Sequence, residues 1–156
     1  MARTSLLSTR VLLVCAAIGV ATGILGGIGA WLTPVVILAA PILYGLVLGV
    51  HVLPGIIAQE TLRLPGVAII SHLIAALAGI ATTFGAFAWQ FLGTAVLFGG
   101  IQVLVAAAFR YRSVAPWRFF ISAFVIGLVS ASAVFFAAHL GSLPLWAQIT
   151  YLVLAV

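Results

Sequence analysis

Six long apolar runs, separated by short segments rich in polar residues, glycine or proline, make up nearly the whole chain. A helix needs about 20 apolar residues to cross roughly 30 Å of hydrocarbon. The pattern therefore predicts an all-α fold: a polytopic membrane helical bundle of six spans in a single domain, residues 1–156. The predicted spans cover residues 11–28, 35–58, 66–81, 86–109, 119–138 and 145–156. The last run would form only about 18 Å of helix, so we expect the sixth span to be truncated.

The overall composition supports a lipid environment. Hydrophobic residues make up 66% of the chain and charged residues only 4%, whereas soluble domains carry roughly 25% charged residues. The basic start and first apolar run are similar to a signal peptide, but the next segment is again membrane sequence. We therefore interpret the first run as a retained span.

The six arginines indicate the sidedness of the spans. They are Arg3, Arg10, Arg63, Arg110, Arg112 and Arg118. All of them fall on one side of the membrane if the chain starts in the cytoplasm, as the positive-inside rule requires. The pattern predicts a cytoplasmic N-terminus. The use of arginine without lysine and the high alanine and glycine content indicate a GC-rich bacterial genome, so we expect a bacterial cytoplasmic membrane location. Because the arginines lie at span ends and form no basic face, we expect no nucleic-acid partner.

Few side chains are available for catalysis. Glu60 is the only carboxylate, since the chain has no aspartate, and His51, His72 and His139 lie in different spans. The sequence therefore offers no acid–base carboxylate pair, no hydrolase triad and no metal-binding motif. We expect no enzyme activity, no cofactor and no metal site.

Small residues recur at four-residue spacing in two spans. The first span holds Gly19, Gly23 and Gly27, with Ala17 and Ala21 close by. The third span holds Ser71, Ala75 and Gly79. Such spacing lets helices approach closely. The sequence leaves open whether these faces pack inside the bundle or dock another membrane protein.

Polar residues inside the spans are candidates for lining a cavity. Tyr44 and His72 are each about nine residues, or roughly 14 Å, below the outer boundary of their spans. Trp89 and Gln90 lie nearer the outer surface, and Gln102 is expected much nearer the cytoplasmic side. The predicted substrate-binding set is Tyr44, His72, Trp89, Gln90, Gln102, Trp31 and His139. Two alternatives stay open: a position such as that of His72 is also typical of a hydrogen bond between helices, and the outer aromatic residues are also typical of an interfacial belt.

The stretch "RLPGVAIISHLIAAL" resembles the third-span signature of the YkoE family of membrane proteins. The upstream stretch "APILYG" is similar to a second motif of that family. The matching residues are Arg63, Pro65, Gly66, Ser71, Ala75 and Ala76 in the third span, and Pro41 and Tyr44 upstream. YkoE proteins are the substrate-binding S components of energy-coupling factor (ECF) vitamin transporters.

This resemblance implies a function and partners. It implies six helices around a site open to the outside, which captures thiamine or its hydroxymethylpyrimidine precursor. Transport would require a transmembrane T component and a pair of cytoplasmic ATPases. The pair Ala17 and Ala21 resembles the small-residue face on which S components dock the T component.

Three positions depart from the family pattern. His72 stands where the pattern has a glutamate, Gly45 follows Tyr44 where the pattern has another, and Gln102 replaces a third acid. None of these residues carries the negative charge that a cationic ligand favours. We therefore expect either a neutral or anionic vitamin-like substrate or a divergent site, and not thiamine itself. The alternative is a membrane structural or assembly protein without a small-molecule site. A channel is less favoured, because it would need a continuous polar pore and the polar residues are scattered.

Overall fold

The computed structural model describes residues 8–40, 43–109, 117–137 and 140–155. Within these ranges the chain forms helices and no strand, which confirms the predicted all-α fold. The elements are α1 (Thr9–Ala39), α2 (Tyr44–Val50), α3 (Leu53–Leu62), α4 (Val67–Thr82), α5 (Ala88–Ala108), α6 (Trp117–Ala137), the 3-10 turn η2 (Leu140–Ser142) and α7 (Leu145–Ala155). Of these helices, α1 and α5 are long and apolar enough to cross a membrane, and shorter apolar helices accompany them. The fold is a helical membrane bundle.

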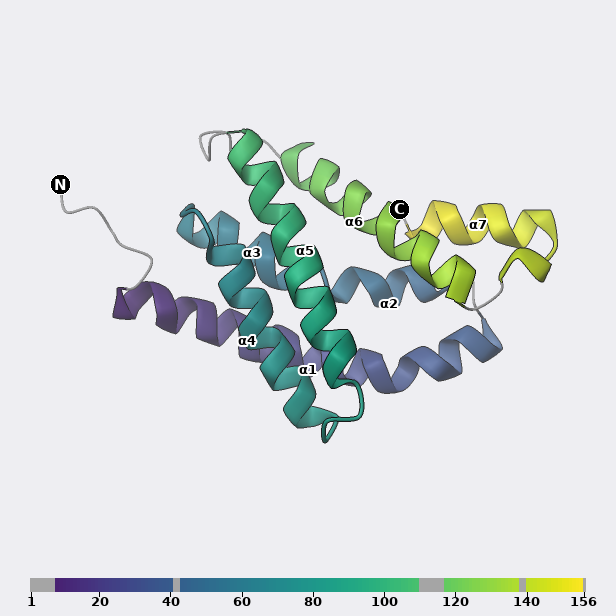
Figure 1. Cartoon of the computed structure of the whole chain (residues 1–156), viewed down its shortest axis with the longest axis horizontal. Helices are drawn as coiled ribbons and strands as arrows, with labels where there is room; N and C mark the ends of the chain where they lie inside the picture. Colours follow the sequence, from purple (N-terminus) through teal and green to yellow (C-terminus); the bar gives the residue numbers. More distant parts are fainter. Residues whose placement is uncertain (1–7, 41–42, 110–116, 138–139, 156) are drawn as a thin grey trace.

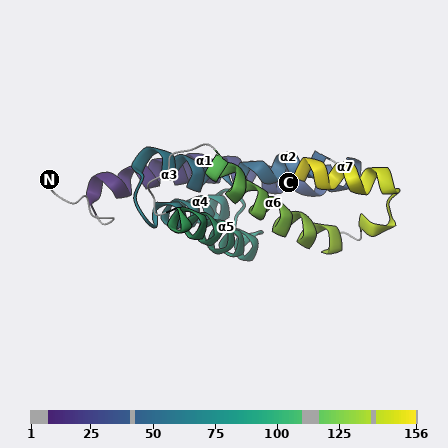
Figure 2. The same ribbon diagram turned by 90° about the horizontal axis from the view of Figure 1, so that it is seen from above.

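The helices are arranged in two layers. Figure 1 shows α4 and α5 side by side, running across α1. Figure 2 shows that α1, α2, α3 and α7 lie in one layer and that α4 and α5 lie in another. The largest contacts join α1 to α4 and α4 to α5, and α3 also packs against α4. Helix α4, which carries the signature stretch, is therefore the centre of the bundle.

The first two predicted spans differ from the helices observed. Residues 29–34, expected as an outer loop, continue α1, with Pro34 inside the helix. The loop expectation was wrong because these residues are mostly apolar, and a continuing helix satisfies their backbone groups internally. The helix ends at Ala39, and Ala40 takes φ −154° because the following proline disfavours a helical conformation. At 31 residues, α1 is about 46 Å long.

The second predicted span, residues 35–58, is also divided. Its residues contribute to the end of α1, to α2 and to α3. His51 and Val52 separate α2 from α3, just before Pro54 in the first turn of α3. Proline has no backbone N–H to donate to the preceding turn, so a break at this point is expected from local chemistry. Sidedness of the spans stays a prediction.

The turn before α4 agrees with the predicted helix start. Arg63 ends α3 in the left-handed conformation with φ 51°, and Gly66 caps α4 with φ 83°. Glycine adopts this backbone conformation without steric cost. The predicted third span, residues 66–81, matches α4 within one residue at each end.

Small residues bring α1 and α4 into close contact. A Cβ atom at Gly19 would lie 2.7 Å from Ile74 Cβ and 2.9 Å from the Ser71 carbonyl oxygen. A Cβ at Gly23 would overlap the Ala75 carbonyl oxygen. The glycine face of α1 therefore packs inside the bundle, one of the two roles that the sequence left open.

Ala17 and Ala21 lie on a different face of α1. Both are exposed, whereas Cys15 on the same helix is completely buried against Val11, Ala58 and Val67. The described helices therefore leave the alanine pair uncovered.

Candidate functional site

A buried hydrogen-bond network joins α3, α4 and α5. His72 Nε2 on α4 lies 3.1 Å from Gln102 Oε1 on α5, and both side chains are buried. Gln102 Nε2 donates to the Val52 carbonyl at 3.0 Å, beside the break between α2 and α3. Gln59 Nε2 donates to the Gln102 carbonyl at 3.1 Å. His72 Nε2, both ends of the Gln102 amide and Gln59 Nε2 thus have partners away from water, as a bundle interior favours.

The contact between His72 and Gln102 corrects the depth expected from the sequence. Residue counts place Gln102 nearer the cytoplasmic side, whereas their side chains are hydrogen-bonded. Counts along two separate helices do not include the tilt or the axial offset of those helices. The helix-to-helix hydrogen bond, one of the two interpretations of His72, is present.

Gly55 allows α3 to approach this network. A Cβ at Gly55 would overlap Gln102 Oε1 and lie 2.9 Å from His72 Nε2. Only a residue without a side chain leaves room for the two polar groups to meet there. This glycine therefore belongs to the structure of the site.

A small cavity lies beside His72, lined by residues of α1, the junction of α2 and α3, α4 and α5. Its wall consists of Thr22, Gly23, Gly26, Val50, His51, Pro54, His72, Ala75, Ala76, Phe91, Thr94 and Ala95. The cavity measures about 20 Å³, which is room for about one water molecule. The His51 ring stacks on Phe91, with ring centroids 6.2 Å apart and planes inclined by 30°. The wall combines aromatic and apolar surface with four polar side chains.

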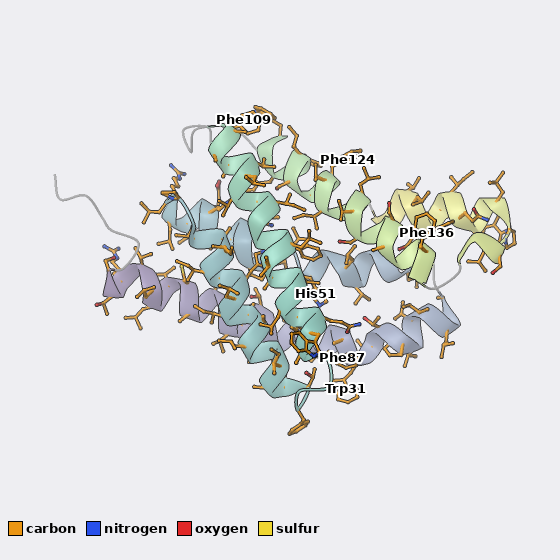
Figure 3. All side chains as sticks on the ribbon, viewed as in Figure 1. Trp31, His51, Phe87, Phe109, Phe124 and Phe136 are labelled. Atoms are coloured by element: carbon orange, nitrogen blue, oxygen red, sulfur yellow. The ribbon has the colours of Figure 1, made fainter. Side chains whose placement is uncertain are left out.

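The remaining predicted residues lie away from this cavity or outside the described part of the chain. Trp89 is 87% exposed, Gln90 is also exposed, and neither belongs to the cavity wall. Trp31 is half exposed and packs edge-on against Phe87, with centroids 5.5 Å apart, as Figure 3 shows. The Tyr44 side chain and the whole of His139 lie outside the described residues.

His51 is a cavity residue that the sequence reasoning did not select. Figure 3 shows it within the bundle, near α5. Its signal was present: a histidine in an apolar run, three residues before a proline that interrupts the helix. The prediction treated residues 35–58 as one continuous span and so gave His51 no particular position. The packed helices place it on the same cavity wall as His72.

The cavity supplies few metal ligands. Within the described ranges, no group of three or more histidine, cysteine, aspartate or glutamate side chains could hold a metal ion. Cys15 is buried in the separate cluster around Val11, and Glu60 is exposed on α3. The two imidazoles of His51 and His72 are the ligand-type side chains on the wall.

The described helices form an apolar bundle with a small, partly polar cavity on which His51 and His72 both lie. A family model described as "ABC-type cobalt transport system, permease component" matches residues 10–129. The chain belongs to this family, and is thus a membrane component of an ABC-type transport system, which implies partner subunits that include ATPases. No curated protein gives a significant match to the chain, and neither does a solved structure.

Proposed function

We propose that this chain is the S component of an ECF importer, the subunit that captures a small vitamin-like molecule from outside a bacterial cytoplasmic membrane. The observation that carries the proposal is the cavity between His51 and His72, enclosed by the helix that bears the YkoE-like stretch. Family membership supports a transport subunit, and the YkoE resemblance supports the S-component role and a thiamine-related substrate.

The chemistry of the cavity favours an organic ring over a metal ion as the substrate. Phe91 and the His51 ring offer flat surfaces for stacking, and Thr22 and Thr94 add polar atoms. Ligand pockets of this kind are mostly apolar with a few placed polar groups.

Cobalt is the second candidate because the family description names it. Imidazole nitrogen is a suitable ligand for a divalent transition metal, and His51 and His72 share the cavity wall. However, the described residues provide no third ligand of the histidine, cysteine or carboxylate type. A dication there would also lack a compensating negative charge. We therefore place cobalt after the organic substrate.

Substrate entry requires the cavity to widen. Its present volume of about 20 Å³ admits about one water molecule, which is too small for an aromatic ring. His51 and Val52 interrupt the regular helix between α2 and α3 on the cavity wall. We propose that movement of α2 opens the site.

The exposed alanines of α1 suit the docking of a partner helix. Ala17 and Ala21 are one turn apart on a face that the bundle leaves uncovered, and small residues permit close helix approach. We propose that the T component binds this face and connects the chain to a pair of cytoplasmic ATPases. This face is separate from the glycine face that packs on α4.

The test measures binding to the full chain in lipid nanodiscs. Thiamine, its hydroxymethylpyrimidine precursor, riboflavin, biotin and CoCl2 are titrated by calorimetry, and uptake is measured in cells that co-express the T component and ATPases. One organic vitamin should bind, and His72→Ala should weaken both binding and uptake. The S-component proposal is refuted if no compound binds and His72→Ala lowers stability without changing uptake. That outcome supports the structural or assembly role instead.

A further inference from the structure

The two threonines on the cavity wall have already used their hydroxyl protons. Thr22 Oγ1 donates to the Ile18 carbonyl at 2.7 Å, and Thr94 Oγ1 donates to the Gln90 carbonyl at 2.9 Å. A hydroxyl has one proton to donate and two lone pairs to accept with. Toward a ligand, each threonine is therefore a hydrogen-bond acceptor.

The His51 ring is fixed as a single tautomer by its backbone contact. Its Nδ1 lies 3.3 Å from the Val47 carbonyl oxygen, and a carbonyl oxygen only accepts, so Nδ1 carries the proton. In the neutral ring, Nε2 is then the unprotonated nitrogen. Nε2 lies beside Gly26, which also lines the cavity, 3.8 Å from the position of a Cβ at that residue.

The tautomer of His72 follows from the orientation of Gln102. The amide nitrogen of Gln102 donates to the Val52 carbonyl, so its Oε1 is the atom that faces His72 Nε2. An amide oxygen accepts, hence His72 Nε2 carries the proton and Nδ1 is left as an acceptor. The Gln102 amide thus fixes the tautomer of His72, whose ring lies on the cavity wall.

We infer that this cavity is an acceptor-only binding site, whose ligand is a small ring bearing N–H donors and without a carboxylate. The inference rests on the proposed function and names the substrate class. All four polar side chains of the wall, Thr22, His51, His72 and Thr94, donate to protein oxygens and have lone pairs left for a ligand. An amino or ring N–H group would find several partners. A carboxylate would meet lone pairs only, and its desolvation would not be compensated.

This chemistry narrows the ligand expected from the sequence. Replacement of the family acids allowed a neutral or an anionic substrate. The wall formed by the described residues disfavours an anionic ligand, because it presents lone pairs to the ligand. It does so although the wall itself carries no negative charge. The site accepts through neutral nitrogen and oxygen atoms in place of carboxylates.

The experiment compares matched probes on the full chain in nanodiscs. The probes are 4-aminopyrimidine, unsubstituted pyrimidine and pyrimidine-4-carboxylate, and the dissociation constants are measured by ligand-observed NMR. We expect the amine to bind at least tenfold more tightly than the carboxylate, with unsubstituted pyrimidine between them. In Thr94→Val, amine affinity should fall about fivefold, the effect of one hydrogen bond.

Thr61→Val is the matched control. Thr61 also donates to a carbonyl four residues earlier, at 2.7 Å, but is exposed and lies outside the cavity wall. Amine affinity should not change in this variant. His51→Phe, which keeps an aromatic ring beside Phe91, should weaken the amine and leave pyrimidine binding within twofold.

The possible failures are distinguishable. If the carboxylate binds as tightly as the amine and Thr94→Val weakens it, the acceptor-only inference is wrong and the S-component proposal stands. If CoCl2 binds, displaces the amine and is lost in His51→Phe, the site is a metal site and the inference is also wrong. If neither the three probes nor the vitamins bind, the inference and the proposed function fall together.

Discussion

Replacing Gly19 with alanine tests the close packing of α1 on α4. The added Cβ would lie 2.7 Å from Ile74 Cβ, 2.8 Å from Ile74 Cγ2 and 2.9 Å from the Ser71 carbonyl oxygen. Real Cβ atoms essentially never make contacts this short, so the two helices must separate. Overpacking of this kind costs about 1–3 kcal/mol, whereas alanine gains about 0.8–1 kcal/mol of helix propensity over glycine. We expect the free energy of unfolding to fall by up to about 2 kcal/mol.

Gly93→Ala is the matched control for this substitution. Gly93 lies within α5, and a Cβ there would meet nothing within 4 Å. The propensity gain is then the main effect, so stability should stay the same or rise by up to about 1 kcal/mol. Unfolding is followed by tryptophan fluorescence during SDS titration in mixed micelles. If Gly19→Ala is as stable as Gly93→Ala, the close α1–α4 contact is refuted.

Two further substitutions test the buried network and the docking face. Gln102→Leu should lower stability by about 1–3 kcal/mol because it leaves the buried proton of His72 without an acceptor, whereas Gln90→Leu, at an exposed position of the same helix, should change stability little. Equal SDS midpoints for the two variants would exclude a stabilising role for the network. Ala17→Leu combined with Ala21→Leu should leave ligand binding and folding intact but abolish co-purification with the T component, since bulky side chains prevent close helix approach. Unchanged co-purification and uptake would place the partner on another face.

The sequence determined the membrane class, the all-α fold and the approximate position of most helices. An apolar run of span length has essentially one way to satisfy its backbone in lipid, so hydropathy identifies α5 as a span candidate and marks α4 and α6 as further apolar helices. Local chemistry also specified the start of α4, where Gly66 adopts a positive φ.

Tertiary structure decided which polar residues share a site. Local chemistry accounts for the continuation of α1 through Pro34 and for the interruption before Pro54, but it did not indicate which polar residues these features bring together. Distance along the chain also gave no indication that Gln102 meets His72, since depth counted in residues does not include helix tilt and offset. The hydrogen bonds that fix both imidazole tautomers involve Val47 and Gln102, one a backbone carbonyl and the other an amide 30 residues from His72. Residue types supplied the possible donors and acceptors; only the packed helices determined which lone pairs remain for a ligand.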